Sequence, residues 1–389
     1  MMYDTIVIGA GIIGASVGYH VARAGGRVAI IDPGMGPVQP TASWASAGGL
    51  RAQGRSPAEA AIAHAAQQRW QVLEDELEAD MEVRFGGHLH IAENAVQAER
   101  IRKRVSEAQD AGIEARLLAE AEIHDIAPGL ARAARLACFT PQDGQASPIL
   151  AARAFLAAAV RLGATLVPQK CASIPVEQGR VSRIVLGDGT SLSARTVVVC
   201  TGAWSISMLD ALGLRFPLRW RVLQMMTTEA QPGVTLAPTV TGEGRNLSLK
   251  QMPDGNYMIG GRWFGNSPDG LLSACPDERH LACQLQTARE VFPAMRHAPV
   301  QRTWAGCEAQ TIDSLPLIGH SALAGLYLSV GFSNHGFQIA PEIGRLVAQD
   351  ITDASPDALH PFAPDRFERQ VSASRVEAFI TETTRLALH

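Results

Sequence analysis

The chain lacks several features that would place it quickly in a functional class. Its 389 residues contain no block of basic residues, which argues against nucleic acid as a partner. They contain no uninterrupted apolar run of about 18 residues or more, which argues against a membrane-spanning helix. Internal repeats and low-complexity tracts are absent, and no long linker separates the two halves. We therefore expect a soluble globular protein with interleaved domains.

Cysteine pairs of the kind that bind metals are also missing. The six cysteines form no CxxC motif and no histidine cluster accompanies them, so we expect no structural zinc or other metal site. Their scatter is typical of reduced, mostly buried thiols. These features predict a cytoplasmic protein, either free or at the periphery of a membrane.

A dinucleotide-binding pattern stands at the start of the chain. The strand-like run Tyr3–Ile8 leads directly into the glycine turn Gly9-Ala10-Gly11-Ile12-Ile13-Gly14. A helical pattern and a second strand follow, and the strand ends in Asp32. In this arrangement Gly9 permits the turn, Gly11 lets a pyrophosphate approach, and Gly14 lets the helix pack closely. The helix N-terminus attracts phosphates and Asp32 can bind a ribose, but the pattern alone does not separate FAD from NAD.

The rest of the chain alternates helical and strand patterns. Amphipathic helices are predicted over 58–77, 93–112 and 149–162, and a final core helix over 341–351. Two β-hairpins are predicted around residues 187–190 and 253–255, and a strand over 326–330. The predicted fold is mixed α/β, with a Rossmann-like nucleotide-binding domain interleaved with a smaller antiparallel-sheet domain. We place the first domain at 1–85, 145–215 and 305–389, and the second at 86–144 and 216–304.

Five segments in order along the chain carry a family resemblance. They read VIGAGIIGASVGYHVARAG, ASWASAGGLR, TVVVCTGAWS, TWAGCEAQTIDSLPLIG and GFSNHGFQIAP. Together they resemble the FAD-dependent amino-acid oxidoreductases typified by D-amino acid oxidase, glycine oxidase and sarcosine oxidase. The closest likeness is to the branch of the sarcosine oxidase β-subunit, with its dehydrogenases for proline, hydroxyproline and opines. The resemblance implies oxidation of a carbon–nitrogen bond, by hydride transfer from the substrate Cα to flavin N5, with FAD more often non-covalent than covalent.

The resemblance also implies roles for individual residues. Asp32 and the glycine turn would hold the adenosine and pyrophosphate, and Ala172 would contact the adenine through its backbone. The loop Gly331–Gln338 would bring a helix N-terminus to the flavin ring. The complete cofactor set is Gly9, Gly11, Ile12, Ile13, Gly14, Asp32, Ser43, Ala47, Gly48, Gly49, Ala172, Gly202, Trp204, Cys307, Gly331, Ser333, Asn334, His335, Gly336, Phe337 and Gln338. Cys307 lies near the place where some sarcosine oxidases attach flavin covalently, and a small buried thiol is the alternative.

A carboxylate-bearing substrate needs a cation, and Arg51 is the first candidate. It follows the flavin-side segment, and a guanidinium can bind a carboxylate through two parallel hydrogen bonds. The alternative is a surface arginine in a loop. His335 would contact the flavin or the amine, or would only shape its own loop. Trp44 is the aromatic residue we place in the substrate pocket, and Trp220, Tyr257 and Trp263 are weaker candidates that are equally explained as core.

The sequence departs from its relatives at three positions that bear on chemistry. Glu308 stands where glycine and D-amino acid oxidases carry an arginine. Gln338 and Met258 stand where monomeric sarcosine oxidases carry lysines, and both are placed here at the substrate. The electron acceptor is therefore left open between oxygen, a quinone and a partner redox subunit in a hetero-oligomer. Two other functions are also open: oxidation of a 2-hydroxy acid, and electron relay within a larger complex.

Overall fold

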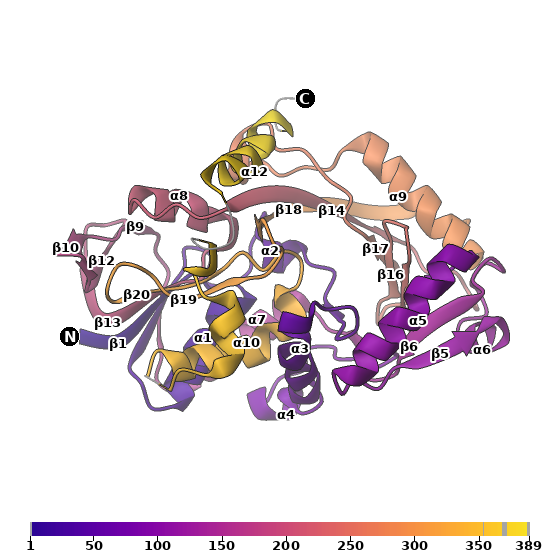
Figure 1. The fold of residues 1–389 in the computed structure, drawn as a ribbon, viewed down its shortest axis with the longest axis horizontal. Helices are drawn as coiled ribbons and strands as arrows, with labels where there is room; N and C mark the ends of the chain where they lie inside the picture. Colours follow the sequence, from indigo (N-terminus) through magenta and orange to yellow (C-terminus); the bar gives the residue numbers. More distant parts are fainter. Residues whose placement is uncertain (1, 353, 368–371, 387–389) are drawn as a thin grey trace.

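The computed structural model describes residues 2–352, 354–367 and 372–386. Its two large sheets each contain eight strands (Figure 1). The first comprises β1 (Met2–Ile8), β2 (Val28–Ile31), β8 (Thr165–Val167), β9 (Cys171–Ser173), β12 (Arg183–Leu186), β13 (Ser191–Val199), β19 (Leu317–His320) and β20 (Leu326–Val330). The second comprises β4 (His88–Ala92), β5 (Arg116–Ala119), β6 (Leu136–Thr140), β14 (Leu218–Thr228), β15 (Thr239–Gly242), β16 (Ser248–Gln251), β17 (Tyr257–Gly260) and β18 (Val300–Thr311).

The first sheet has the parallel core expected of a nucleotide-binding domain. Its main path runs β19-β20-β13-β1-β2-β8, with β1 parallel to both β2 and β13. The inner strands are continuous apolar runs because both of their faces are covered. The carboxyl ends of β1 and β2 lie at the same edge of the sheet, where the glycine turn and Asp32 follow them.

The second sheet is assembled from segments that lie far apart in the chain. Its order is β18-β14-β17-β16-β15-β4-β6-β5. All of its pairs are antiparallel except β15 with β4, and that parallel pair joins residues 88–140 to residues 218–311. The predicted fold class is confirmed. The predicted domain limits remain a prediction, and β18 runs unbroken across the limit set between 304 and 305.

Helices cover both sheets and the space between them. They are α1 (Ile12–Arg23), α2 (Ala42–Ala45), α3 (Pro57–Trp70), α4 (Leu73–Leu77), α5 (Ala95–Asp110), α6 (Glu120–Ile126), α7 (Pro148–Arg161), α8 (Ser205–Ala211), α9 (Glu278–Val291), α10 (Gly336–Asp350) and α12 (Ala373–Leu386). Figure 1 shows α1, α7 and α10 grouped beside the first sheet, and α5 and α9 beside the second. In the described part of the chain, every helix is too short or too polar to cross a membrane. Two short ribbons, β3 (Gly49–Leu50) with β7 (Gly144–Gln145) and β10 (Val176–Glu177) with β11 (Arg180–Val181), complete the fold.

Two predicted helices differ from those in the structure. The helix predicted over 58–77 is two helices in the structure, because the chain turns after Trp70 at the end of α3. Helix α4 then ends at Glu78, which has a left-handed conformation. The final helix, predicted from Pro341 onward, begins at Gly336 instead. Proline favours the first turn of a helix, which suggested a start at Pro341. In the structure this proline lies inside α10, a position that packing against α1 and α3 supports.

Helices α1 and α10 cross at very short distance. The Ser16 hydroxyl donates a hydrogen bond to the Ala340 carbonyl over 2.8 Å. A Cβ atom on Gly344 would lie 2.1 Å from Ser16 Oγ and 2.7 Å from the Ser16 carbonyl carbon. The absence of a side chain at residue 344 therefore sets how closely the two helices approach.

We expect Gly344→Ala to lower the free energy of unfolding by about 1–3 kcal/mol, because an overpacked core must shift its backbone. Thermal unfolding of the FAD-loaded chain would measure this effect. Gly187→Ala is the matched control: its Cβ would meet only Lys170 O at an ordinary 3.7 Å. A melting temperature equal to that of the control would contradict the packing constraint.

Candidate functional site

One large cavity of about 1010 Å³ lies between the two sheets. Its size is at the upper end of the range for small-molecule sites, so it can hold an extended cofactor together with a substrate. The glycine turn and Asp32 line one end, and side chains of β4 and β15 line the other. Most predicted cofactor residues line it, namely Gly9, Gly11, Ile12, Ile13, Asp32, Ser43, Ala47, Gly48, Gly49, Gly202, Trp204, Cys307 and Gly331–Gln338.

The glycine turn has the geometry that close phosphate approach requires. Gly9 has φ +101°, and a Cβ there would lie 2.6 Å from Cys200 O. Gly14 is outside the cavity lining, and its Cβ would lie 1.9 Å from Gly9 O, so its role is close helix packing. The N-cap residue of α1 is a glycine without a side-chain cap, so N–H groups of the first turn beyond Ile12 can donate to the phosphate oxygens of a ligand.

The residues around this turn fit the adenosine part of FAD. Asp32 accepts hydrogen bonds from the backbone N–H groups of Ala10 and Gly34, both over 2.8 Å, which orients its carboxylate at the cavity wall. The Ser43 hydroxyl accepts a hydrogen bond from Ile12 N. The Thr201 hydroxyl also lines the cavity, and it is buried without a hydrogen-bond partner within 2–352, 354–367 and 372–386. An unpartnered buried hydroxyl at this place is expected where a ligand supplies the partner.

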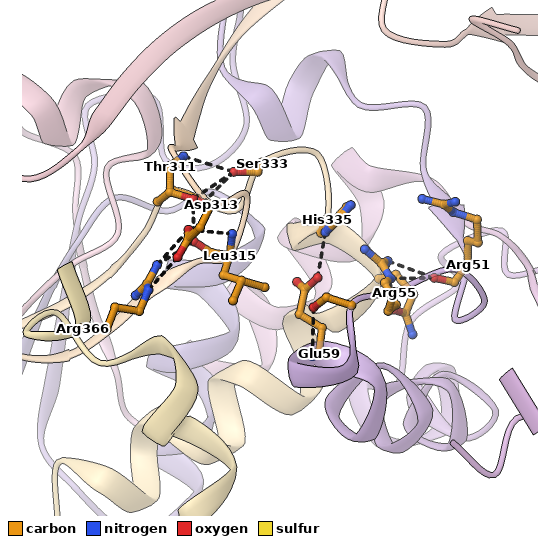
Figure 2. A network of polar contacts seen from close by, with 12 residues as sticks. Arg51, Arg55, Glu59, Thr311, Asp313, Leu315, Ser333, His335 and Arg366 are labelled. Atoms are coloured by element: carbon orange, nitrogen blue, oxygen red, sulfur yellow. Dashed lines mark hydrogen bonds and ion pairs between the residues drawn. The ribbon is translucent and has the colours of Figure 1, made fainter. Parts of the chain in front are cut away.

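The loop Gly331–Gln338 is held in place from behind by a polar network (Figure 2). Arg366 forms an ion pair with Asp313 at 2.9 Å and donates to Leu315 O. The Thr311 hydroxyl also donates to Leu315 O, and Ser333 Oγ accepts from Thr311 N. The hydrogen bond from Thr311 ties Ser333 to β18. Ser333 and Asn334 both adopt positive φ angles. This bend places the uncapped N-terminus of α10 at the cavity, where its dipole favours negative charge.

Helix α3 supports the same loop from the other side. His335 Nδ1 lies 2.9 Å from the buried Glu59 carboxylate, as Figure 2 shows. Burial is the main cause that lowers the pKa of His335 to about 4, and the nearby Arg55 lowers it further. The imidazole is therefore neutral at physiological pH. With Glu59 as acceptor, the proton resides on Nδ1 and leaves Nε2 as a hydrogen-bond acceptor.

Gln338 is buried and its amide is used inside the protein. Its Nε2 donates to Ala63 O over 2.8 Å, and its Oε1 accepts from Arg55 Nη2 over 3.2 Å. Its backbone carbonyl accepts from Trp70. Although Gln338 lines the cavity, the structure gives it the role of joining α10, α3 and Arg55.

Arg51 lies in the cavity wall without a partner for its charge. Its backbone carbonyl accepts two hydrogen bonds from Arg55, but its guanidinium has no acceptor among the described residues. Burial lowers the pKa of Arg51 to about 9, and the neighbouring cations Arg55 and Arg104 lower it further. The side chain is only partly buried and lines the cavity, so a ligand carboxylate there could accept from its guanidinium.

A buried polar network fixes the backbone beside Arg51. The Asp143 carboxylate accepts from Ala52 N over 2.9 Å, from Gln67 Nε2 over 2.7 Å and from the Thr140 hydroxyl over 2.6 Å. The side chain of Gln53 donates to the Thr140 hydroxyl and to the His88 carbonyl. These contacts hold the loop after β3 against β4 and β6, so Arg51 projects from a rigid segment.

Besides Gly14, three predicted site residues lie outside the cavity lining. Trp44 packs under Arg302, whose guanidinium lies 5.5 Å from the ring centroid. Met258 is buried on β17 opposite Lys250, on the cavity side of the sheet but beyond the lined region. Ala172 is exposed on β9, and its neighbours Lys170 and Cys171 line the cavity instead.

The other aromatic candidates are also absent from the lining. Tyr257 packs against Phe292 in the core on the far face of the second sheet. Trp263 donates to Asn246 O and lies near His280. Trp220 packs at the edge of a small cluster around Cys307. Core packing, the alternative offered by the sequence, thus accounts for Tyr257.

Several lining residues were not among the predicted ones. Arg55, His88, His90, Arg104, Glu308 and Arg262 line the cavity near Arg51 or face it across the sheet. His88 and His90 alternate on β4, so their two-residue spacing was a usable signal for one shared face. Arg104 gave no such signal, because a mixed-charge helix normally turns its charges to solvent. Glu308 is half-buried, and desolvation raises its pKa to about 7.

Cys307 is a buried thiol in the wall. Its Sγ lies 3.6 Å from the Leu271 carbonyl, and burial raises its pKa to about 11. The thiol is therefore protonated at neutral pH, which disfavours nucleophilic attack on a flavin. In the described residues no group of three or more His, Cys, Asp or Glu is arranged to hold a metal ion.

Comparisons with known proteins agree with this geometry. Glycine oxidase from Bacillus licheniformis is 26% identical over 359 residues, spanning 90% of this chain and 93% of the relative. Sarcosine oxidase subunit beta from Arthrobacter sp. is 24% identical over 388 residues, spanning 94% and 91%. The crystal structure of L-proline dehydrogenase from P. horikoshii has a TM-score of 0.87 at 24% identity, covering 95% of this chain and 98% of that one, which shows a common fold.

The family described as "DAO: FAD dependent oxidoreductase" matches residues 4–350, which is most of the chain. The resemblance noted in the sequence and the choice of FAD over NAD are both confirmed. The protein is therefore a member of the DAO family of FAD-dependent oxidoreductases.

Proposed function

We propose that the protein oxidises the carbon–nitrogen bond of a secondary, cyclic or N-substituted amino acid, of the sarcosine, proline, hydroxyproline or opine type. The observation that carries the proposal is the unpartnered Arg51 guanidinium in a cavity that also fits FAD. The names of the relatives, glycine oxidase and sarcosine oxidase subunit beta, support the same substrate class. When bound, FAD would accept the hydride that leaves the substrate Cα.

The protein's own groups would bind and orient the substrate. Arg51 would hold the carboxylate through paired hydrogen bonds. The neutral His335 imidazole would accept a hydrogen bond from the amine N–H at Nε2, since its Nδ1 is directed to Glu59. The substrate binds with a neutral amine after releasing its proton to solvent, the loss of a hydride from Cα gives an iminium ion, and water hydrolyses that ion. The pKa of His335 is too low for it to act as the base, so we assign it to positioning.

We also propose that the electron acceptor is not oxygen alone. Gln338 and Met258 are uncharged, so neither supplies the cation that a lysine would supply at these two positions. We therefore propose a dehydrogenase that transfers electrons to a quinone or a partner redox subunit. The subunit name of the Arthrobacter relative favours the second acceptor.

The test of the reaction class is anaerobic titration of the FAD-loaded protein with amino acids. The panel comprises sarcosine, both prolines, hydroxyprolines, glycine and D-alanine, with lactate for the 2-hydroxy acid alternative. Loss of flavin absorbance with an amino acid supports amine oxidation, and loss with lactate alone supports the alternative. Admission of air then shows whether oxygen reoxidises the flavin.

We expect Arg51→Met to lower kcat/KM for the amino acid by about 100-fold, because a charged hydrogen-bond pair is removed from a water-poor site. FAD content, read from the visible spectrum, should not change. Arg195→Met is the control, since that arginine is exposed on β13. Unchanged kinetics in Arg51→Met would show that another cation binds the carboxylate.

His335→Gln should affect both catalysis and the acid sensitivity of the fold. The loss of the amine's acceptor should lower kcat/KM by about 10-fold. Because the folded pKa is depressed to about 4, His335 contributes stability that is present above pH 6.5 and is lost as pH falls towards 4. At pH 5 this loss is about 2 kcal/mol, so the variant's melting temperature should fall less between pH 7.5 and 5.

The matched control for this experiment is His360→Gln, which alters an exposed histidine. An acid dependence of His335→Gln equal to that of the wild type would contradict the neutral, buried imidazole. If kcat/KM falls while the pH dependence of the melting temperature stays that of the wild type, only the positioning of the substrate amine by His335 is supported.

A further inference from the structure

The substrate end of the cavity carries more positive charge than one carboxylate needs. Arg51, Arg55, Arg104 and Arg262 all line it. Arg245 also lines it, but ion pairs with Glu93 and Glu290, both at 2.6 Å, already neutralise that residue. Among the described lining residues near this end, Glu308 is the carboxylate, and burial raises its pKa to about 7. Near neutral pH, Glu308 therefore offsets only part of one positive charge.

Arg104 has a hydrogen-bond donor that is not used within the protein. It projects from α5, and its Nη1 is buried without a hydrogen-bond partner among the residues that the structure describes. Its Nη2 lies 3.8 Å from Glu243. That carboxylate already binds Arg100 at 3.0 Å and His90 at 3.0 Å, so it balances Arg104 only weakly.

The chain makes room for this guanidinium in the wall. Gly54 follows Arg51 in the same loop, and a Cβ there would lie 1.7 Å from Arg104 Nη1. Gly54 also has φ +67°, a conformation that other residues rarely adopt. The loop that carries Arg51 is thus shaped to receive Arg104 from α5, which brings two cations from different elements to one wall.

The neighbours on β4 and β15 do not compete for an anion at this place. His88 Nε2 and His90 Nδ1 both lie within 2.8 Å of the Thr241 hydroxyl. Burial lowers the pKa of His88 to about 4 and that of His90 to about 2, so both rings are neutral. They enclose the corner with polar groups and add no charge.

Glu59 and Asp143 favour the charged form of Arg55, whereas Arg104 has beside it a Glu243 carboxylate that it shares with Arg100. A ligand that supplies negative charge would stabilise this partly buried guanidinium.

We propose that the substrate is an amino acid with a second carboxylate, in which Arg51 binds the carboxylate next to the reacting carbon and Arg104 binds the other. This inference rests on the proposed function and narrows it to dianionic amine acids. A 2-hydroxy diacid would meet the same two arginines, so the nature of the reacting group is tested separately.

The first test compares substrates that differ only in the second carboxylate. Sarcosine is paired with iminodiacetate, and N-methylalanine with N-(1-carboxyethyl)alanine, in anaerobic reduction of the FAD-loaded protein. We expect the dicarboxylate of a pair to give a kcat/KM at least about 10-fold higher, as a charged hydrogen bond in a buried site provides. Equal or faster reduction by the monocarboxylates overturns the inference while the proposed function stands.

A binding measurement keeps the two proposals separate if no amine is oxidised. Malonate and succinate are compared with acetate and propionate as perturbants of the flavin spectrum. Binding of a dianion at least about 10-fold tighter than its monoanion supports two carboxylate sites even when the proposed reaction fails. Equal affinities overturn the inference.

The residue test uses two arginines of the same helix. Arg104→Gln should reduce the ratio of kcat/KM for the dicarboxylate to kcat/KM for the monocarboxylate to about threefold or less. Arg100→Gln removes the other α5 arginine that pairs with Glu243 but does not line the cavity, and it should keep the preference. Arg104→Lys should retain part of the preference for the dicarboxylate. This variant replaces Arg104→Gln in the test if Arg104→Gln does not fold. An equal loss for both substrates in Arg104→Gln overturns the assignment.

Discussion

The close crossing of α1 and α10 is the constraint on which the rest of the site depends. Ser16 and Gly344 bring these helices together although more than 300 residues separate them. Each helix begins at the cavity, α1 after the glycine turn and α10 after the loop Gly331–His335. Two uncapped N-termini therefore face one ligand, and both favour negative charge. Neither could be placed in this way if the other helix moved.

The segments with strong local chemistry could be predicted from the sequence. The turn from Gly9 to Gly14 and the loop near 331–338 require special backbone conformations, and such needs leave a readable pattern. Asp32 could be predicted as a carboxylate at the end of the second strand. The strand and hairpin patterns were also strong enough to find β16, β17 and β20. Proline misled at 341 because its local preference was overridden by contacts with α1 and α3, which no local pattern reveals.

The substrate end could not be predicted in the same way, because it is assembled from distant segments. Arg104 reaches the cavity only because α5 packs over β4 and β6, and because Gly54 leaves space for its guanidinium. Gln338 follows the flavin-side loop in the sequence, which predicted a role at the substrate. In the structure its amide instead binds Ala63 and Arg55. Roles of this kind follow from tertiary partners and not from sequence spacing.

The distribution of charge in the cavity connects the two ends of the site. Histidines near the reacting region are kept neutral by burial, whereas Arg51 remains a cation because its pKa, lowered to about 9, still lies above neutral. A cavity with neutral imidazoles and charged guanidiniums attracts anions and offers them no acidic imidazolium proton. Its affinity for an anionic substrate should then vary little between pH 6 and 8 on account of these groups. Within that range Glu308 is the lining carboxylate expected to change state, and it becomes more negative as pH rises. It would weaken anion binding at the upper end, so the preference for a dianion should be greatest at the acidic side of neutrality.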